Sequence, residues 1–138
     1  MKKLFLIAMC LLTWTAQAGG NKHQVTVVVK NIKANTGEIR ASLYVSESSF
    51  LKEGVYVSQK VTGNDELTLV FDPVEAGVYA VSIYHDENAN GELDTWVFGI
   101  PAEPYGFSND AKGSYGPPSF ADAQFEVATD QNITITLH

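Results

Sequence analysis

Apolar residues recur at every second position along most of this chain, and this alternation constrains the fold more than any other feature. Successive side chains of a β-strand point to opposite faces of a sheet, so a period of two indicates strands with one buried face. No stretch of a dozen residues shows a helical period. We predict an all-β, antiparallel sandwich of about seven strands, immunoglobulin-like or transthyretin-like. The expected strands are residues 23–30, 37–46, 55–61, 66–71, 77–85, 124–128 and 132–137.

Turn signals between these segments predict how the strands connect. Residues 33–37 contain an asparagine and a glycine, which tolerate the left-handed backbone of a tight reversal. We therefore expect the strands at 23–30 and 37–46 to pair as a hairpin. Pro73 is expected to end the fourth strand, because proline lacks the N–H that a ladder requires. The segment 77–85 is apolar at nearly every position, which predicts a central strand.

The first eighteen residues have the composition of an export signal. Two lysines precede an apolar run, residues 4–12, that is too short to span a bilayer as a helix, and Ala-Gln-Ala follows at 16–18. We predict that residues 1–18 are a cleaved signal peptide and that 19–138 form a single β-sandwich domain. This domain is expected in the bacterial periplasm or outside the cell. The alternatives are a retained membrane anchor or lipid attachment at Cys10.

Composition excludes several classes of function. The chain has 9 Lys and Arg against 16 Asp and Glu, a formal net charge of −7, and its one cysteine is Cys10 in the predicted signal. An acidic protein repels nucleic acid and anionic lipid. A mature domain without cysteine has no disulfide and no thiol chemistry. We expect no membrane span in the mature protein, and partners among small molecules, glycans and envelope proteins.

An acidic, amide-rich turn follows the strand predicted at 77–85. Its residues fill the phased positions of D-x-[DN]-x-[DN]-G, a calcium-loop pattern in which oxygen ligands alternate and a glycine makes the bend. The twelfth position lacks a glutamate, so the turn is not an EF-hand. The alternative is a type I′ turn at Asn90-Gly91 with solvated neighbours. The expected calcium ligands are Asp86, Asn88, Asn90, Glu92 through its backbone carbonyl, and Asp94, with Glu103 as a further candidate.

A long segment, residues 95–123, lacks alternation but is rich in glycine, proline and aromatic residues. Long loops in compact domains are usually functional or disordered, and six aromatic side chains argue against disorder. These rings either form a stacking platform for a sugar or a partner, or they fold back to cap the sandwich. The expected binding surface combines four rings with two ionisable neighbours: Trp96, Tyr105, Phe107, Tyr115, His85 and Glu103.

The same residues allow a catalytic interpretation. His85 lies beside Asp86 and has the chemistry of a general base, and Glu87 with Glu92 resembles the carboxylate pair of a glycosidase. One short loop does not flank a sugar ring, however, and a histidine at a strand end often packs or caps. We therefore predict a non-catalytic binding or structural module with no catalytic residue. The alternative is a carbohydrate-active enzyme or accessory domain that uses residues 98–120 as its substrate surface.

Two motifs carry a resemblance to a known family. The first is H-D-E-N-A-N-G-E-L-D at residues 85–94, and the second is F-G-I-P-A-E-P-Y-G-F-S-N at residues 98–109. With the rest of the mature domain, they resemble the DUF2141 family of exported bacterial proteins. The resemblance implies an uncharacterised single β-sandwich domain of the periplasm or cell exterior. It implies no reaction, cofactor or catalytic residue.

Overall fold

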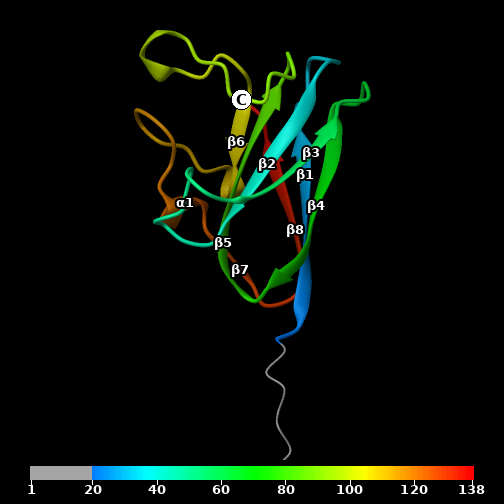
Figure 1. Ribbon diagram of the computed structural model, residues 1–138, viewed down its shortest axis with the longest axis vertical. Coiled ribbons are helices and arrows are strands. Elements are labelled where there is room, and N and C mark those ends of the chain that lie inside the picture. The colour runs from blue at the N-terminus through cyan, green and yellow to red at the C-terminus, as the bar shows by residue number, and fades with distance from the viewer. Residues whose placement is uncertain (1–19) are drawn as a thin grey trace, which may run out of the picture.

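The computed structural model describes residues 20–138 and shows two β-sheets packed face to face (Figure 1). The predicted signal peptide, residues 1–18, lies outside the described residues. The prediction of an all-β sandwich is confirmed, with eight strands in the described part instead of about seven. The elements are β1 (Lys22–Lys30), β2 (Glu38–Tyr44), β3 (Val55–Lys60), β4 (Glu66–Glu75), β5 (Gly77–Asp86), η1 (Val97–Gly99), β6 (Tyr105–Phe107), η2 (Ser108–Asp110), α1 (Phe120–Ala123), β7 (Phe125–Val127) and β8 (Gln131–Thr136).

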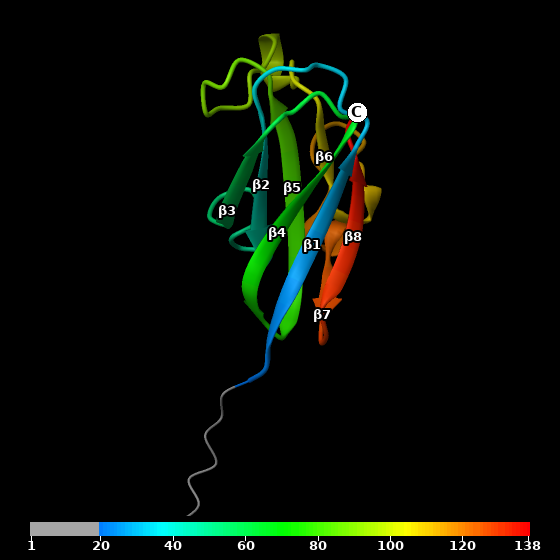
Figure 2. The ribbon, with the colours of Figure 1, turned by 90° about the vertical axis from the view of Figure 1, so that its right-hand side faces the viewer.

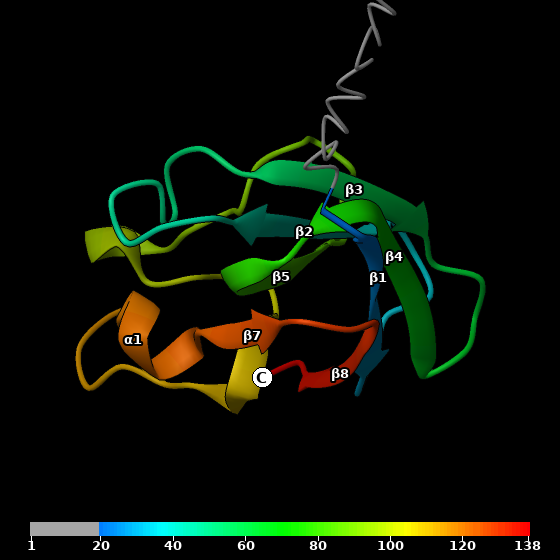
Figure 3. The same cartoon turned by 90° about the horizontal axis from the view of Figure 1, so that it is seen from below.

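The strands divide into a smaller sheet, in the order β4-β1-β8, and a larger sheet, in the order β3-β2-β5-β6. β7 pairs with the first residues of β5. Neighbouring strands run antiparallel except β1 and β8, which are parallel. Figure 2 shows the smaller sheet in front of the larger one, and Figure 3 shows both layers from below. β5 lies between β2 and β6, so the prediction of a central strand is confirmed.

The alternation of the sequence places one face of each long strand in the core. On β1 the inward side chains are Val25, Val27 and Val29, and all three are fully buried. Inward residues of β2, β4, β5 and β8 complete one hydrophobic cluster with them. Each fully buried aliphatic or aromatic side chain contributes about 1.5–3 kcal/mol to folding. This cluster therefore holds the two sheets together.

The predicted hairpin between residues 23–30 and 37–46 does not form. β1 pairs with β4 and β8, whereas β2 pairs with β3 and β5 in the other sheet. Both strands carry an apolar face that must be covered. Side-by-side pairing leaves these faces on one open side of a sheet, whereas opposite layers bury them against each other. The segment 31–37 is therefore a crossing between the sheets.

Pro73 does not end the fourth strand, contrary to the prediction. β4 continues to Glu75 through a cis peptide bond between Asp72 and Pro73. β4 is an edge strand, and its register against β1 shifts between His23 and Val25. Edge positions and bulges are the places where a strand tolerates a residue without an N–H. The strand therefore accommodates Pro73 where the ladder is already irregular.

The segment 95–123 contains more regular structure than its sequence predicts. β6 pairs with β5, and Tyr105 exchanges two backbone hydrogen bonds with His138, at 3.0 and 3.2 Å. These bonds join the end of the chain, just after β8, to the larger sheet. A Cβ atom at Gly106 would lie 2.7 Å from Ile135 Cγ2. Glycine therefore permits the close approach of β6 to β8.

A second apolar cluster lies on the outer face of the larger sheet. The ring of Phe50 lies 6.2 Å from that of Phe107 and 5.8 Å from that of Phe120, measured between centroids. Part of the aromatic segment thus folds back over the sheet, while Trp96 and Tyr115 stay exposed. Phe107 and Phe120 thus follow the alternative in which the rings cap the sandwich, and the stacking platform stays a prediction. Within residues 20–138, no helix is long and apolar enough to cross a membrane.

Candidate functional site

Asp86, the last residue of β5, organises the turn that follows it, which we call the acidic loop (residues 86–94). Its side chain is completely buried. Oδ1 accepts a hydrogen bond from the backbone N–H of Asn90 at 3.1 Å, and Oδ2 accepts one from the N–H of Gly91 at 2.8 Å. Gly91 adopts a positive φ of 83°, which glycine allows without strain. The carboxylate thereby closes the loop onto the end of the strand.

Arg40, on the neighbouring strand β2, supplies the positive charge beside Asp86. Its Nε donates to Asp86 Oδ2 at 2.9 Å, and its guanidinium forms a second ion pair with Glu38. Desolvation opposes the charge of Arg40, but the pKa is raised on balance because Tyr56, Glu38 and other acidic groups favour the charged form. Arg40 therefore remains a cation that compensates the buried carboxylate.

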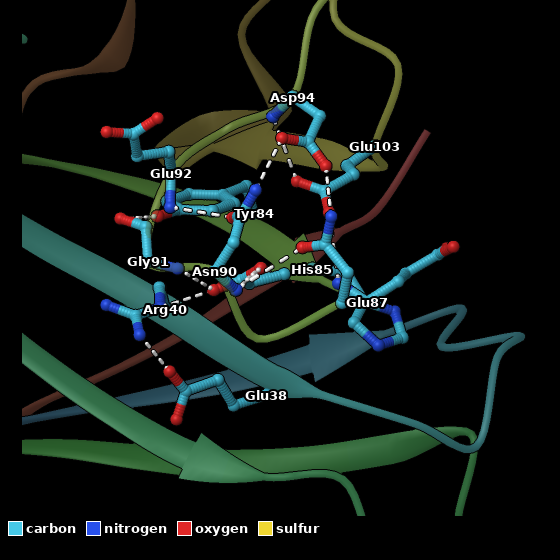
Figure 4. A network of polar contacts seen from close by, with 12 residues as sticks. Glu38, Arg40, Tyr84, His85, Glu87, Asn90, Gly91, Glu92, Asp94 and Glu103 are labelled. Carbon is cyan, nitrogen blue, oxygen red and sulfur yellow. Dashed lines mark hydrogen bonds and ion pairs between the residues drawn. The ribbon is translucent and has the colours of Figure 1, made fainter.

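At the tip of the acidic loop, two amide side chains converge on one carboxylate. Asn88 Nδ2 donates to Asp94 Oδ2 at 2.5 Å, and Asn90 Nδ2 donates to Asp94 Oδ1 at 2.7 Å. The two amide oxygens accept from the loop backbone: Asn88 Oδ1 from Asn90 N–H at 3.3 Å, and Asn90 Oδ1 from Glu92 N–H at 3.0 Å. The carboxylate of Glu92 points away from this cluster (Figure 4). The structure thus brings together the side chains of Asn88, Asn90 and Asp94 above Asp86.

Glu103 ties the two ends of the acidic loop together. Its carboxylate accepts from the backbone N–H of Glu87 at 3.2 Å and of Asp94 at 3.1 Å. The residue is only 7 % exposed, so its expected place on a binding surface is wrong. A carboxylate that satisfies two loop N–H groups is a structural anchor. Tyr84 adds a further link, since its hydroxyl donates to Gly91 O at 3.2 Å.

His85 also does not belong to the exposed surface predicted for it. It faces the core opposite Ile39, is fully buried, and bonds through Nε2 to Thr36 O at 2.7 Å. Its Nδ1 has no hydrogen-bond partner. Because β5 alternates, residue 85 shares the inward face of Val81 and Ile83, and the period of two was the signal that predicts this orientation. A base buried in this way cannot reach a ligand outside the sandwich.

A groove of about 630 Å³ lies on the outer face of the larger sheet. Outward side chains of the sheet form its floor, including Tyr84 of β5 and Tyr105 of β6. One wall contains Leu93 and residues 98–101, and the other is residues 113–117. Figure 1 shows both wall segments, around η1 (yellow-green) and before α1 (orange), projecting from the same side of the sheet.

The groove unites three of the four rings of the predicted binding surface. Tyr105, Phe107 and Tyr115 line it, whereas Trp96 does not. Burial raises the pKa of the floor residue Tyr84 above its ordinary value, and nearby Asp86 raises it too, outweighing the opposite effect of Arg40. Tyr84 is therefore a neutral phenol.

Residues 27–136 match a family described as uncharacterized protein conserved in bacteria (DUF2141). The chain belongs to the DUF2141 family. No curated protein and no solved structure matches the chain. The acidic loop and both walls of the groove lie inside the matched range, so they are parts of the DUF2141 domain.

Sequence reasoning missed several residues of this DUF2141 site. Arg40 and the floor residue Tyr44 come from β2, far in sequence from the acidic loop and the aromatic segment, whereas the floor residue Ser82 lies on β5, which leads into the acidic loop. Their only local signal is an outward position on an amphipathic strand. Phe98 belongs to the alternative substrate surface, residues 98–120, but not to the predicted set of binding residues, and it lines the groove while 97 % exposed.

Proposed function

We propose that this DUF2141 domain is a non-catalytic binding module of the periplasm or cell exterior, with an acidic loop that binds calcium. The observation that carries the proposal is the convergence of Asn88, Asn90 and Asp94 on a loop already closed by Asp86. The export signal predicted at residues 1–18 supports the location. Extracellular modules commonly bind calcium at about 10⁻⁴ to 10⁻³ M.

The donor set of the loop suits a hard cation. Calcium takes six to eight oxygen ligands from carboxylates, amide and backbone carbonyls, and water. The acidic loop has four carboxylates in nine residues and neither lysine nor arginine. Rotating the amides of Asn88 and Asn90 by half a turn would direct their oxygens toward Asp94. In the described part of the chain no three His, Cys, Asp or Glu side chains are placed to hold a metal, so the amide oxygens are essential to the proposal.

Calcium would link the loop to the groove. The backbone of Asp94 contacts the next segment, because Asp94 O accepts from Ala102 N–H at 2.7 Å. Residues 93 and 98–101, which form one wall, lie within or directly after the acidic loop. A cation that orders Asp94 would therefore hold this wall in place. In this arrangement calcium has a supporting role and the groove binds the ligand.

The lining of the groove favours binding over catalysis. A glycosidase needs two carboxyl groups that flank the scissile bond. None of the described residues that line the groove is Asp, Glu, His, Lys or Arg. His85 is in the core, and both oxygens of Glu103 are occupied by backbone N–H groups. These positions support a binding module over the alternative of a carbohydrate-active enzyme.

Calcium at about 5 mM is expected to raise the free energy of unfolding by about 1–2 kcal/mol relative to chelator, from mass action at the affinity given above. The midpoint of thermal unfolding should rise by roughly 3–8 °C for a domain of this size. Differential scanning calorimetry with calcium, magnesium and chelator measures the shift. Magnesium should act less, because it demands a tighter octahedral shell.

Two variants, a test and its control, each remove one negative charge. Asp94→Asn should remove the calcium shift, because it deletes the carboxylate on which the amides converge. Glu126→Gln, at an exposed position of β7, should keep the shift. An unchanged midpoint of the native protein, or an equal calcium response of both variants, would rule the calcium site out.

A further inference from the structure

The groove has an unusual combination of lining groups. Hydroxyl groups come from Tyr44, Ser82, Tyr84 and Tyr105 on the floor and from residues 114 and 115 on one wall. Aromatic and aliphatic groups fill the rest, and no described lining side chain is charged. Its volume of about 630 Å³ lies in the range of small-molecule sites, about 300–1,000 Å³. The groove is therefore a neutral surface with both apolar faces and hydrogen-bonding groups.

Two aromatic side chains stand unburied on opposite walls. Phe98 is 97 % exposed and Tyr115 is fully exposed, although both line the groove. Neither ring contributes buried apolar area to folding, and both are accessible to a ligand in the groove. Two rings on facing walls are suited to stacking against a flat apolar face of a ligand.

The backbone conformation of Phe98 is unfavourable, and no burial of its side chain compensates for this cost. It has φ 66° and ψ 21°, a left-handed conformation that is unfavourable for a bulky residue. Its side chain has no burial to offset this cost. The segment around it is nevertheless well defined, with Trp96 N–H donating to Ile100 O at 2.6 Å and Gly99 N–H to Trp96 O at 3.2 Å. A tight hairpin thus presents Phe98 toward the groove.

From these observations we propose that the groove binds a neutral saccharide chain, with Phe98 and Tyr115 stacking on sugar rings. The inference rests on the proposed binding function. Sugar rings offer an apolar C–H face to aromatic rings and hydroxyls to the phenols and serines of the groove. The described lining offers no carboxylate to pair with a cationic ligand, and the net charge of −7 repels anions. A purely apolar ligand would leave the Tyr105 hydroxyl without a partner, whereas Tyr44 bonds to Ser82 and Tyr84 bonds to Gly91 O within the protein.

The test uses neutral, anionic and apolar probes. Cellohexaose, maltohexaose and hexa-N-acetylchitohexaose are titrated in the presence of calcium, beside hexagalacturonate and the apolar compound N-phenyl-1-naphthylamine. Calorimetry measures binding. We expect at least one neutral hexasaccharide to bind with a Kd of about 10⁻⁴ M, and hexagalacturonate to bind at least tenfold more weakly.

Three variants locate the binding. Phe98→Asn and Tyr115→Ser should each weaken saccharide binding about tenfold, whereas Trp96→Ser should not, because Trp96 is exposed on the same hairpin but does not line the groove. Phe98→Asn should leave the unfolding midpoint unchanged or raise it, since asparagine tolerates the left-handed conformation. A loss of affinity in that variant is then not a loss of folding.

The outcomes separate this inference from the proposed function. No binding of any neutral hexasaccharide, or equal losses in the Trp96 and Phe98 variants, overturns the saccharide site. If the anionic or the apolar probe binds instead and depends on Phe98, the groove is a binding site for another class and only the saccharide inference fails. Cleavage of a bound hexasaccharide would overturn the non-catalytic function itself.

Discussion

Replacing Asp86 with alanine is expected to lower the free energy of unfolding by about 3–5 kcal/mol, the cost typical of removing one partner from a buried ion pair. The carboxylate is completely buried and accepts hydrogen bonds from Asn90, Gly91 and Arg40. Its loss leaves the Gly91 N–H without an acceptor, leaves the Asn90 N–H with only its 3.3 Å bond to Asn88, and leaves the partly buried guanidinium with only Glu38. Urea denaturation in the presence of chelator measures the effect without a contribution from calcium.

A second carboxylate and a double variant test the reason for this loss. Asp65→Ala, at an exposed position without a side-chain hydrogen bond, should change stability by less than about 0.5 kcal/mol. Replacing Arg40 together with Asp86 should cost less than the sum of the single replacements, because the unpaired cation is removed too. A loss below about 1 kcal/mol in Asp86→Ala would show that the loop does not depend on this carboxylate.

Replacing Gly37 with alanine is expected to lower the free energy of unfolding by about 2–4 kcal/mol, from a left-handed backbone and a steric clash together. Gly37 has φ 71°, and a Cβ atom there would lie 2.0 Å from Asp86 O and 2.8 Å from the carbonyl carbon of Glu87. These are backbone atoms at the start of the acidic loop and cannot rotate away. The same urea titration measures this change.

Gly99 provides a control that separates the cost of the left-handed backbone from the cost of the steric clash. It has a similar φ of 73°, but a Cβ atom there would meet nothing within 4 Å. Gly99→Ala should therefore cost only the backbone term, about 1–2 kcal/mol. Because Gly37 packs against the acidic loop and Gly99 does not, only Gly37→Ala should also reduce the calcium response. Equal decreases in the free energy of unfolding of the two variants would mean that the contact between Gly37 and the acidic loop does not contribute to stability.

Most strands of the fold follow from the sequence because their signal is local. Alternation of Val25, Val27 and Val29 predicts β1, and the same period predicts β2 and β4, whereas the nearly continuous apolar run at residues 77–85 predicts β5. Pairing between strands is not local, since it depends on which apolar face covers which. The predicted hairpin of residues 23–30 with 37–46 failed for this reason. Pro73 shows the same limit, because only the pairing reveals the bulge at which it is tolerated.

For the candidate site too, the sequence predicted the local features and the structure was needed for the others. The spacing of Asp86, Asn88, Asn90 and Asp94 predicted one loop of oxygen ligands. The structure brings the side chains of Asn88, Asn90 and Asp94 together, whereas the Asp86 carboxylate bonds to Arg40 and to two loop N–H groups. Calcium itself stays a prediction. The burial of His85 was also readable from the strand period, but its position next to the acidic turn suggested a surface role instead.

By itself, the sequence determined that the chain is an all-β domain, that it belongs with DUF2141, and where its acidic loop turns. Only the tertiary structure decided that Arg40 compensates Asp86, that Gly37 packs under the loop, and that residues 98–101 and 113–117 face each other across a groove. The physical reason is the distance along the chain over which each effect acts. Strand period and turn chemistry act between neighbours in the chain, whereas charge compensation, steric fit and cavities arise between segments that only the packing of the two sheets brings together.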